Sequence, residues 1–245
     1  MVSSKDSQTI PSSHNELFNN QWKVYQKVLN NNYLWHRENY DILHAFLVRN
    51  FQKPFKMLEL GCGDASFTNL ALLDTSVEFY RGIDLSKAAL EIANLNMASI
   101  KCSKSFTEGD FSELVPEIVK NQQNSFDVIL ISFALHHLLL ERKDYIIGQL
   151  FNLLADNGVF ILIDIVRKPQ EDRETYMRRF LDIRQKNWSL ITGEEYSMVT
   201  NHILSKDFPE TQQTLYSIAK KHNFNRVECL YSDPFDITQL LCLYR

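Results

Sequence analysis

The chain has 245 residues, few glycines, few cysteines and no long apolar run. Its four cysteines are far apart and form no CxxC pair, which excludes a zinc knuckle and argues against a disulfide framework. The longest apolar stretch, residues 128–140, contains a serine and two histidines and is too short to cross a bilayer. The first thirteen residues lack the apolar core of a signal peptide. These absences predict a soluble, cytoplasmic protein.

Positive charge is not in excess either. There are 26 Lys and Arg residues against 30 Asp and Glu, a formal net charge of −4. This balance argues against a general nucleic-acid binder and against binding to anionic membranes. With 44% hydrophobic and 23% charged residues, the chain has an ordinary globular composition and can bury a core. We expect a monomer or a homodimer with no nucleic-acid or membrane partner.

The N-terminal quarter of the chain has helical periodicity. Residues 1–13 are polar and are predicted to form a flexible tail, and residues 14–53 a helical cap. Apolar residues recur there at steps of three or four, first at Phe18, Trp22, Tyr25 and Leu29 and then at Tyr40, Leu43, Leu47 and Phe51. Pro54 ends this region, because the residue before a proline is disfavoured in helical geometry.

After Pro54, short apolar runs alternate with helical patterns. Strands are predicted at 56–60, 78–83, 102–108, 126–132 and 159–166, and helices at 65–73, 86–97, 112–121 and 142–154. The fourth and fifth runs are apolar at nearly every position, as in strands covered on both faces. This alternation predicts an α/β fold in residues 54–245, with a mostly parallel sheet and helices on both faces.

Residues 167–208 interrupt the alternation. They are charged and helical in pattern, with aromatic residues interspersed, and we predict a helical lid inserted after the fifth strand. A helix at 210–222 follows, and then strands at 224–231 and 235–244. The short connection through Asp233-Pro234 predicts a hairpin, which puts one antiparallel strand at the end of the sheet.

Two of the seven glycines lie in one turn, in Glu59-Leu60-Gly61-Cys62-Gly63, between the first strand and its helix. Without a Cβ atom, the backbone can approach a ligand closely, and the next helix offers free N–H groups to an anion. Glycine pairs also occur in such turns for tight turning alone. The loop alone therefore does not establish a ligand site, and its neighbours must be considered with it.

Acidic residues end the next two strands. Asp84 follows Gly82-Ile83, where a Rossmann-like crevice places an acid on ribose hydroxyls, although Asp84 also suits a helix N-cap. Asp110, with Phe111 next to it, suits an adenine amino group and ring, or a simple turn. Because the carboxyl ends of parallel strands meet at one edge of a sheet, these features together predict a nucleoside site.

With these motifs, the sequence resembles the class I S-adenosylmethionine-dependent methyltransferases over about residues 55–166. The resemblance rests on 59–63, 82–86, 108–111, 126–138 and 154–160. Ala65 departs from it, since many members have a third glycine there. The family implies a Rossmann-like, seven-stranded sheet with its last strand antiparallel, and S-adenosyl-L-methionine as cofactor, with S-adenosyl-L-homocysteine as its product. The sequence shows no cluster of metal ligands, so we expect no metal.

The resemblance also implies individual roles. The methionine end of the cofactor would lie on the loop of Glu59, Leu60, Gly61, Cys62 and Gly63. Asp84 with Leu85 would hold the ribose, and Asp110 with Phe111 the adenine. Ser132, at the end of the fourth strand, would lie beside the sulfonium methyl group.

Two adjacent histidines follow the fourth strand. His136 and His137 are candidate general bases, because imidazole titrates near neutral pH, and His136 is favoured because it is nearer the strand. The alternative is that the pair caps or holds the loop. Further residues are candidate contacts for the substrate: Tyr33, His36 and Arg37 before Pro54, Asp164 at the end of the fifth strand, and Trp188, which we expect mainly in the core of the lid.

The sequence thus predicts methyl transfer to a small molecule, because the insertion would enclose a pocket. A non-catalytic cofactor-binding or scaffolding subunit with the same fold is one alternative. An NAD-dependent oxidoreductase is another, but its G-x-G-x-x-G pattern fails at Ser66. A DNA amino-methyltransferase would need an Asp/Asn-Pro-Pro-aromatic motif where this chain has Ser132-Phe133-Ala134-Leu135.

Overall fold

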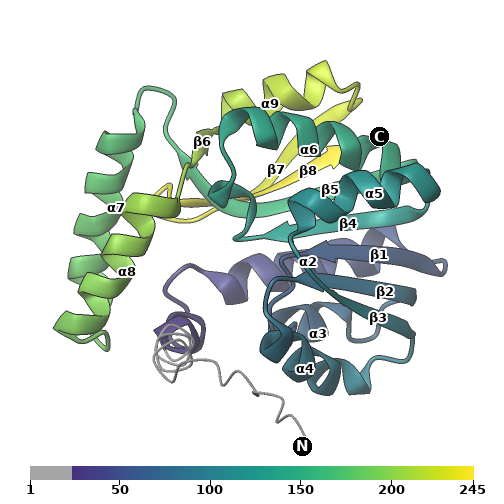
Figure 1. The fold of residues 1–245 in the computed structure, drawn as a ribbon, viewed down its shortest axis with the longest axis horizontal. Helices are drawn as coiled ribbons and strands as arrows, with labels where there is room; N and C mark the ends of the chain where they lie inside the picture. Colours follow the sequence, from purple (N-terminus) through teal and green to yellow (C-terminus); the bar gives the residue numbers. More distant parts are fainter. Residues whose placement is uncertain (1–23) are drawn as a thin grey trace, which may run out of the picture.

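In the computed structural model, residues 24–245 are described, and they form one twisted sheet between two layers of helices (Figure 1). The predicted tail, Phe18 and Trp22 lie outside the described residues. The strand order is β3-β2-β1-β4-β5-β8-β7, and a two-residue strand, β6 (Glu210–Thr211), pairs with the end of β5. The strands are β1 (Phe55–Leu60), β2 (Val77–Asp84), β3 (Ser103–Glu108), β4 (Phe126–Ser132), β5 (Leu154–Arg167), β7 (Arg226–Ser232) and β8 (Thr238–Tyr244). This is the Rossmann-like arrangement that the sequence predicts.

Helices cover both faces of the sheet. One face packs against α2, α3 and α4, and the other against α5, α6 and α9. The helices are α2 (His36–Asn50), α3 (Ser66–Leu72), α4 (Lys87–Asn96), α5 (Phe111–Asn121), α6 (Leu140–Leu153), α7 (Arg173–Asn187), α8 (Gly193–Lys206) and α9 (Gln212–Lys221). Residues 24–30 are also helical. Short 3₁₀ turns lie at Met97–Ser99 and Leu135–His137.

Strand β4 shows why its sequence is apolar at nearly every position. Val128 and Leu130 pack into the core under α2, α3 and α4, whereas Ile129 and Ile131 pack into the core under α5, α6 and α9. All four side chains have no exposed surface. Full burial of each stabilises the fold by about 1.5–3 kcal/mol relative to an exposed position. Strand β4 is therefore anchored in the core on both faces of the sheet.

The predicted terminal hairpin is confirmed, and its turn depends on one buried carboxylate. Asp233 accepts hydrogen bonds from the backbone N–H groups of Phe235, Ile237 and Thr238. The antiparallel strand is β8. We had expected the antiparallel strand at the edge, but it lies between β5 and β7, so β7 forms the edge.

Several predicted boundaries differ from the structure by a few residues, and the starts of α9 and β5 are two of them. The helix expected at 210–222 begins at Gln212, because the side chain of Thr211 caps it by accepting from the backbone N–H of Thr214 at 3.0 Å. Glu210 instead forms a buried ion pair with Lys143, at 3.0 Å. Strand β5 starts at Leu154, where we expected the last residue of a helix.

The insertion 167–208 contains α7 and α8, which stand beside the sheet (Figure 1). Tyr176, Phe180 and Ile203 from these helices pack with Ile165, near the end of β5, in a core of their own. Within residues 24–245, none of the helices combines the length and the apolar character needed to cross a bilayer.

Candidate active site

The glycine turn after β1 has backbone angles that favour glycine. Gly61 and Gly63 have φ values of +73° and +52°, and a Cβ atom on Gly61 would lie only 2.7 Å from the Cβ of Ala134. Ala65, where we noted the missing third glycine, is also left-handed, with φ 50°. The turn therefore keeps the glycine-type backbone even where the residue is alanine.

Glu59 is buried beneath this turn. Its carboxylate accepts hydrogen bonds from Thr68 Oγ1 at 2.8 Å and from the Tyr80 hydroxyl at 2.5 Å. Burial raises the pKa of Glu59 to about 7, although both hydrogen bonds lower it. Leu60, next in the chain, is fully buried in the sheet core. Glu59 thus supports the turn from below, and Leu60 anchors it.

The two acids at the strand ends have different roles in the backbone. Asp84 accepts from the N–H groups of Gly63 and Ser86, each at 2.8 Å, and so ties the glycine turn to the end of β2. Ser86, not Asp84, caps α4. Asp110 does cap α5, accepting from Ser112 at 2.7 Å. Each carboxylate oxygen has a further lone pair, so these bonds leave acceptors for a ligand.

A cavity of about 550 Å³ opens above these elements. It brings together seven of the ten predicted cofactor residues, namely Gly61, Gly63, Asp84, Leu85, Asp110, Phe111 and Ser132. Glu59 and Cys62 line a smaller adjoining cavity that shares Gly61 and Ser132. The volume suits a nucleoside ligand, and a Cβ atom on Gly63 would enter open space, with only the Tyr25 hydroxyl near it among residues 24–245, at 3.8 Å. These residues fit S-adenosyl-L-methionine.

A second cavity, of about 270 Å³, is mostly apolar and lies under α7 and α8. It shares Tyr25, Phe133, His137 and His202 with the first cavity, so the two meet there. Among the five predicted substrate residues, His36 and Trp188 line it.

Tyr33 and Asp164 contact residues that line this cavity, whereas Arg37 does not reach it. Tyr33 stacks on Trp188, with ring centroids 4.9 Å apart, and its hydroxyl accepts from the N–H of Leu190. Arg37 is exposed, and its guanidinium donates to the backbone oxygen of Asn30. Tyr33 thus supports the wall, and Arg37 lies at the surface.

His36 contributes a neutral imidazole to the apolar cavity. It is buried, and burial lowers its pKa to about 3. Its ring packs on Phe133, 4.6 Å away between centroids. Phe133 itself has a left-handed backbone, with φ 50°, directly after β4. Such a strained non-glycine residue is typical of functional sites, and its ring separates the two cavities.

His136 is buried in the wall of the second cavity, next to the shared residue His137, and Asp164 lies behind it. Nδ1 of His136 is 2.5 Å from Oδ1 of Asp164, and its backbone N–H donates to Oδ2 at 2.9 Å. Asp164 also accepts from the N–H of Ile165 and is 3% exposed. Asp164 therefore positions His136, and it is His136 that lines the cavity.

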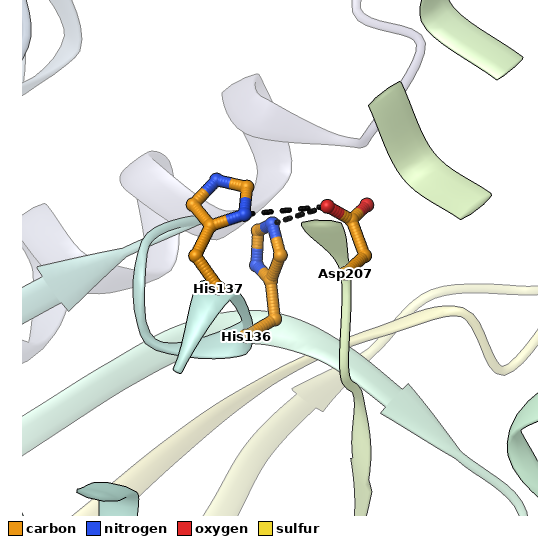
Figure 2. A group of neighbouring side chains, drawn as sticks. All are labelled: His136, His137 and Asp207. Atoms are coloured by element: carbon orange, nitrogen blue, oxygen red, sulfur yellow. Dashed lines mark ion pairs between the residues drawn. The ribbon is translucent and has the colours of Figure 1, made fainter. Parts of the chain in front are cut away.

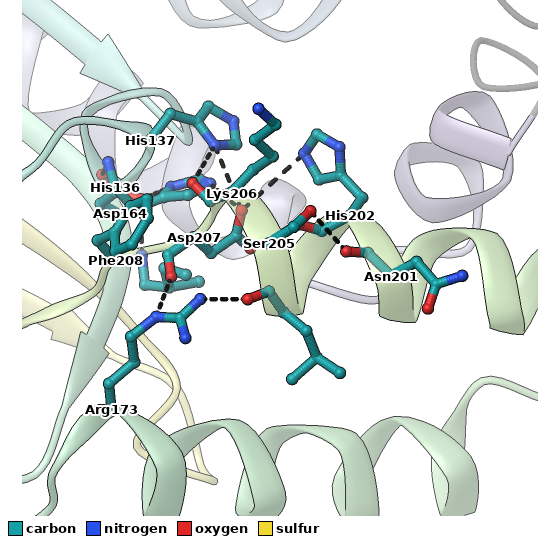
Figure 3. A network of polar contacts seen from close by, with 12 residues as sticks. His136, His137, Asp164, Arg173, Asn201, His202, Ser205, Lys206, Asp207 and Phe208 are labelled. Carbon is teal, nitrogen blue, oxygen red and sulfur yellow. Dashed lines mark hydrogen bonds and ion pairs between the residues drawn. The ribbon is translucent and has the colours of Figure 1, made fainter.

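Two residues that we did not single out in the sequence complete this cluster. Asp207, just after α8, lies beside His136 and His137 (Figure 2), and His202, on α8, lies next to them (Figure 3). Burial lowers the pKa of His136, but Asp164 and Asp207 outweigh this and raise it above its ordinary value. The local signal in the sequence was a histidine five residues before an aspartate at the end of the lid, which points to a site only when the fold is known.

Comparison with known proteins agrees with this geometry. Residues 52–223 match the family model described as a methyltransferase domain. An uncharacterized methyltransferase of Bacillus mycoides is 31% identical over 132 residues, which cover 54% of this chain and 55% of that protein. Phosphoethanolamine N-methyltransferase of Plasmodium falciparum is 25% identical over 105 residues, covering 41% and 39%.

Solved structures share the fold. A SAM-dependent methyltransferase from Archaeoglobus fulgidus superposes with a TM-score of 0.55 and 13% identity, covering 87% of this chain and 99% of that one. The chain spans about half the length of several curated relatives that it matches, from 46% to 57%. The family match covers most of the chain, from before β1 to the end of α9, and the chain belongs to the methyltransferase-domain family.

Proposed function

We propose that this chain transfers a methyl group from S-adenosyl-L-methionine to a small-molecule acceptor. One observation carries the proposal: a cavity lined by the glycine turn and the strand-end acids meets a mostly apolar cavity at Phe133 and His137. The first cavity suits the cofactor and the second the acceptor. Their junction is where an acceptor atom would approach the methyl group.

The cofactor supplies an activated methyl group on a cationic sulfur. The chain's own residues then align the acceptor and exclude water. The apolar walls, which include His36, Phe180 and Trp188, exclude water from the second cavity. As the new bond to carbon forms, the C–S bond breaks and the sulfur keeps its electron pair. In the metal-free protein, Nε2 of His136 takes the acceptor's proton, because Asp164 holds Nδ1.

Three features support a small acceptor. The second cavity holds only about 270 Å³, and α7 and α8 cover it. The net charge of −4 disfavours nucleic acid. One relative, the Plasmodium falciparum enzyme, is named for phosphoethanolamine, which is a small molecule.

Calorimetry with S-adenosyl-L-homocysteine tests the cofactor site. We expect one-to-one binding by the wild-type chain. Asp84→Ala should weaken it by about 1–3 kcal/mol, because ribose hydroxyls lose a buried acceptor. Asp41→Ala, an exposed position on α2, is the matched control and should bind as wild type.

A screen of small acceptors then tests the transfer. Product S-adenosyl-L-homocysteine should accumulate with at least one acceptor. Absence of cofactor binding would overturn the proposal. Tight binding without turnover on any small molecule, peptide or RNA would instead favour a non-catalytic cofactor-binding subunit, and turnover on a peptide or RNA alone would overturn the acceptor class.

A further inference from the structure

Three imidazoles converge on one carboxylate oxygen beside the junction of the two cavities. Figure 2 shows those of His136 and His137, and Figure 3 shows that of His202 as well. Oδ1 of Asp207 lies 3.7 Å from Nε2 of His136, 3.3 Å from Nδ1 of His137 and 3.9 Å from Nε2 of His202. Asp207 is only 4% exposed. Among residues 24–245, its Oδ1 accepts no hydrogen bond. A buried carboxylate oxygen without a donor is costly, so it points to a missing partner.

The spacing of these atoms is slightly wider than that of ligands around one ion. N–H···O hydrogen bonds are about 2.9 Å long, shorter than all three separations. Ligands bound to Zn²⁺ at about 2.0–2.2 Å lie roughly 3–3.6 Å from one another in tetrahedral geometry. One ligand atom each from His136, His137 and Asp207 lies within 4.8 Å of the others. A small inward movement of the side chains would complete the set.

His136 is already oriented for coordination. Because Nδ1 faces the Asp164 carboxylate, the neutral ring keeps its proton there and leaves the Nε2 lone pair directed towards Asp207. A carboxylate behind a histidine is the usual support of a metal-binding imidazole, since it fixes the tautomer and the ring orientation.

The segment that carries Asp207 is also held in place (Figure 3). Arg173, on α7, donates from Nε to the backbone oxygen of Asp207 at 2.7 Å. The N–H of Phe208 donates to the backbone oxygen of His136 at 2.8 Å, which ties the end of the lid to the turn after β4. Backbone contacts therefore hold the segments that carry the Asp207 carboxylate and the His136 imidazole in position.

His137 can join the set at little cost. Its Nδ1 lies 3.3 Å from the backbone oxygen of Lys206, a long contact in which the nitrogen must donate. Coordination would move that proton to Nε2 and give up only this contact. The ring is exposed, so it can turn, and His202 lies edge-on beside it, with ring centroids 5.5 Å apart.

We propose that His136, His137 and Asp207 bind one divalent cation of the Zn²⁺ type, with His202 next to it and open positions facing the cavity. Two imidazoles and a carboxylate suit Zn²⁺, Co²⁺ or Fe²⁺ better than Mg²⁺ or Ca²⁺, which prefer oxygen ligands. Three protein ligands with an open position are the pattern of catalytic sites, not structural ones.

The role of the ion rests on the proposed function. An acceptor hydroxyl that enters an open position would release its proton to water, and its oxygen would then attack the methyl carbon as the C–S bond breaks. Because Nε2 of His136 would be a ligand, the ion would replace this imidazole in deprotonating the acceptor. The proposal thus selects acceptors that present an ionisable oxygen.

Metal titration of the full chain tests the site. After treatment with EDTA, Zn²⁺ is titrated by calorimetry and Co²⁺ by its visible absorption. We expect one ion per chain, and Asp207→Asn and His137→Gln should each weaken binding at least about tenfold. His44→Gln is the control, because His44 lies on α2 and its Nδ1 contacts the backbone oxygen of Ala71. It should bind metal as wild type.

Parallel titration with S-adenosyl-L-homocysteine separates the two proposals. Asp207→Asn and His44→Gln, neither of which lines the proposed cofactor cavity, should bind it within twofold of wild type. Failure of Zn²⁺ and Co²⁺ to bind, or binding that both ligand variants retain, would overturn the metal site while intact cofactor binding leaves the proposed function standing. Loss of cofactor binding in the wild-type chain would overturn the proposed function instead. If Asp207→Asn does not fold, His137→Gln, whose ring is exposed, decides the result.

Discussion

Oδ1 of Asp164 lies 2.5 Å from Nδ1 of His136, and Oδ2 accepts the backbone N–H of the same histidine. One buried carboxylate thus fixes both the ring and the main chain of the residue that faces the acceptor cavity. Asp164 comes from β5 and His136 from the turn after β4, two strands that pair in parallel. The sheet register therefore sets the position of the candidate base.

Asp164→Asn should separate positioning from binding. The amide cannot accept from both His136 and its backbone as the carboxylate does, so the ring loses its fixed tautomer. We expect turnover with an acceptor found in the screen to fall about 10- to 100-fold. His136→Ala, assayed in EDTA, should lower it about 10²–10⁴-fold. S-adenosyl-L-homocysteine should bind both variants as it binds wild type, and equal activity of Asp164→Asn and wild type would show that the pair is only structural.

Glu59→Gln should change how stability depends on pH. The folded-state pKa of Glu59 is about 7, above its ordinary value of 4.5. Between these values the unfolded chain loses the proton and the folded chain keeps it, so the free energy of unfolding falls as pH rises. The loss amounts to about 3 kcal/mol and is complete above about pH 7. The variant lacks this titration and should lose less stability than wild type over this range.

Urea unfolding at several pH values between 4.5 and 8 measures this difference. Glu78→Gln, an exposed glutamate on the neighbouring strand β2, is the matched control and should follow the wild-type profile. A Glu59→Gln variant with the same pH dependence as wild type would mean that the Glu59 carboxylate is ionised throughout. Changes in the hydrogen bonds of residue 59 with Thr68 and Tyr80 would shift the free energy of unfolding of the variant by an amount that does not vary with pH.

The sequence predicted the sheet correctly and pointed to residues that line one cavity, because both signals are local. Apolar runs mark β4 and β5, and the glycine turn, Asp84 and Asp110 each follow a strand directly. Parallel strands bring such ends together without further information. This rule alone explains why seven of the predicted cofactor residues line one cavity.

The polar cluster could not be predicted in the same way. Asp207 and His202 are far along the chain from His136, and only the packing of α7 and α8 brings them to it. Contacts such as that of Arg173 with the backbone of Asp207 set this packing and leave no periodic signal. Our expectation of no metal rested on the absence of metal-binding residues clustered in the sequence, whereas the fold places His136, His137 and Asp207 side by side.

Trp188→Ala should affect the acceptor and spare the cofactor. Trp188 lines the apolar cavity, and its stacking on Tyr33 joins the lid to the N-terminal helices, as the Lys27–Glu195 ion pair also does at 2.6 Å. An aromatic stack is worth about 0.5–1.5 kcal/mol, so we expect the KM for the acceptor to rise about 2- to 10-fold from this contact alone. The dissociation constant of S-adenosyl-L-homocysteine should not change.

Hydrogen exchange tests whether the stack of Trp188 on Tyr33 affects the helices of the lid. If residues 167–208 act as a lid, exchange in α7 and α8 should slow when acceptor and S-adenosyl-L-homocysteine bind together, and Trp188→Ala should reduce this protection. Trp188→Phe keeps a ring over Tyr33 and should retain most of it. Protection that is equal in all three proteins would show that the stack does not couple the lid to the acceptor. Protection that is absent from the wild type would show that these helices cover the cavity without closing on it.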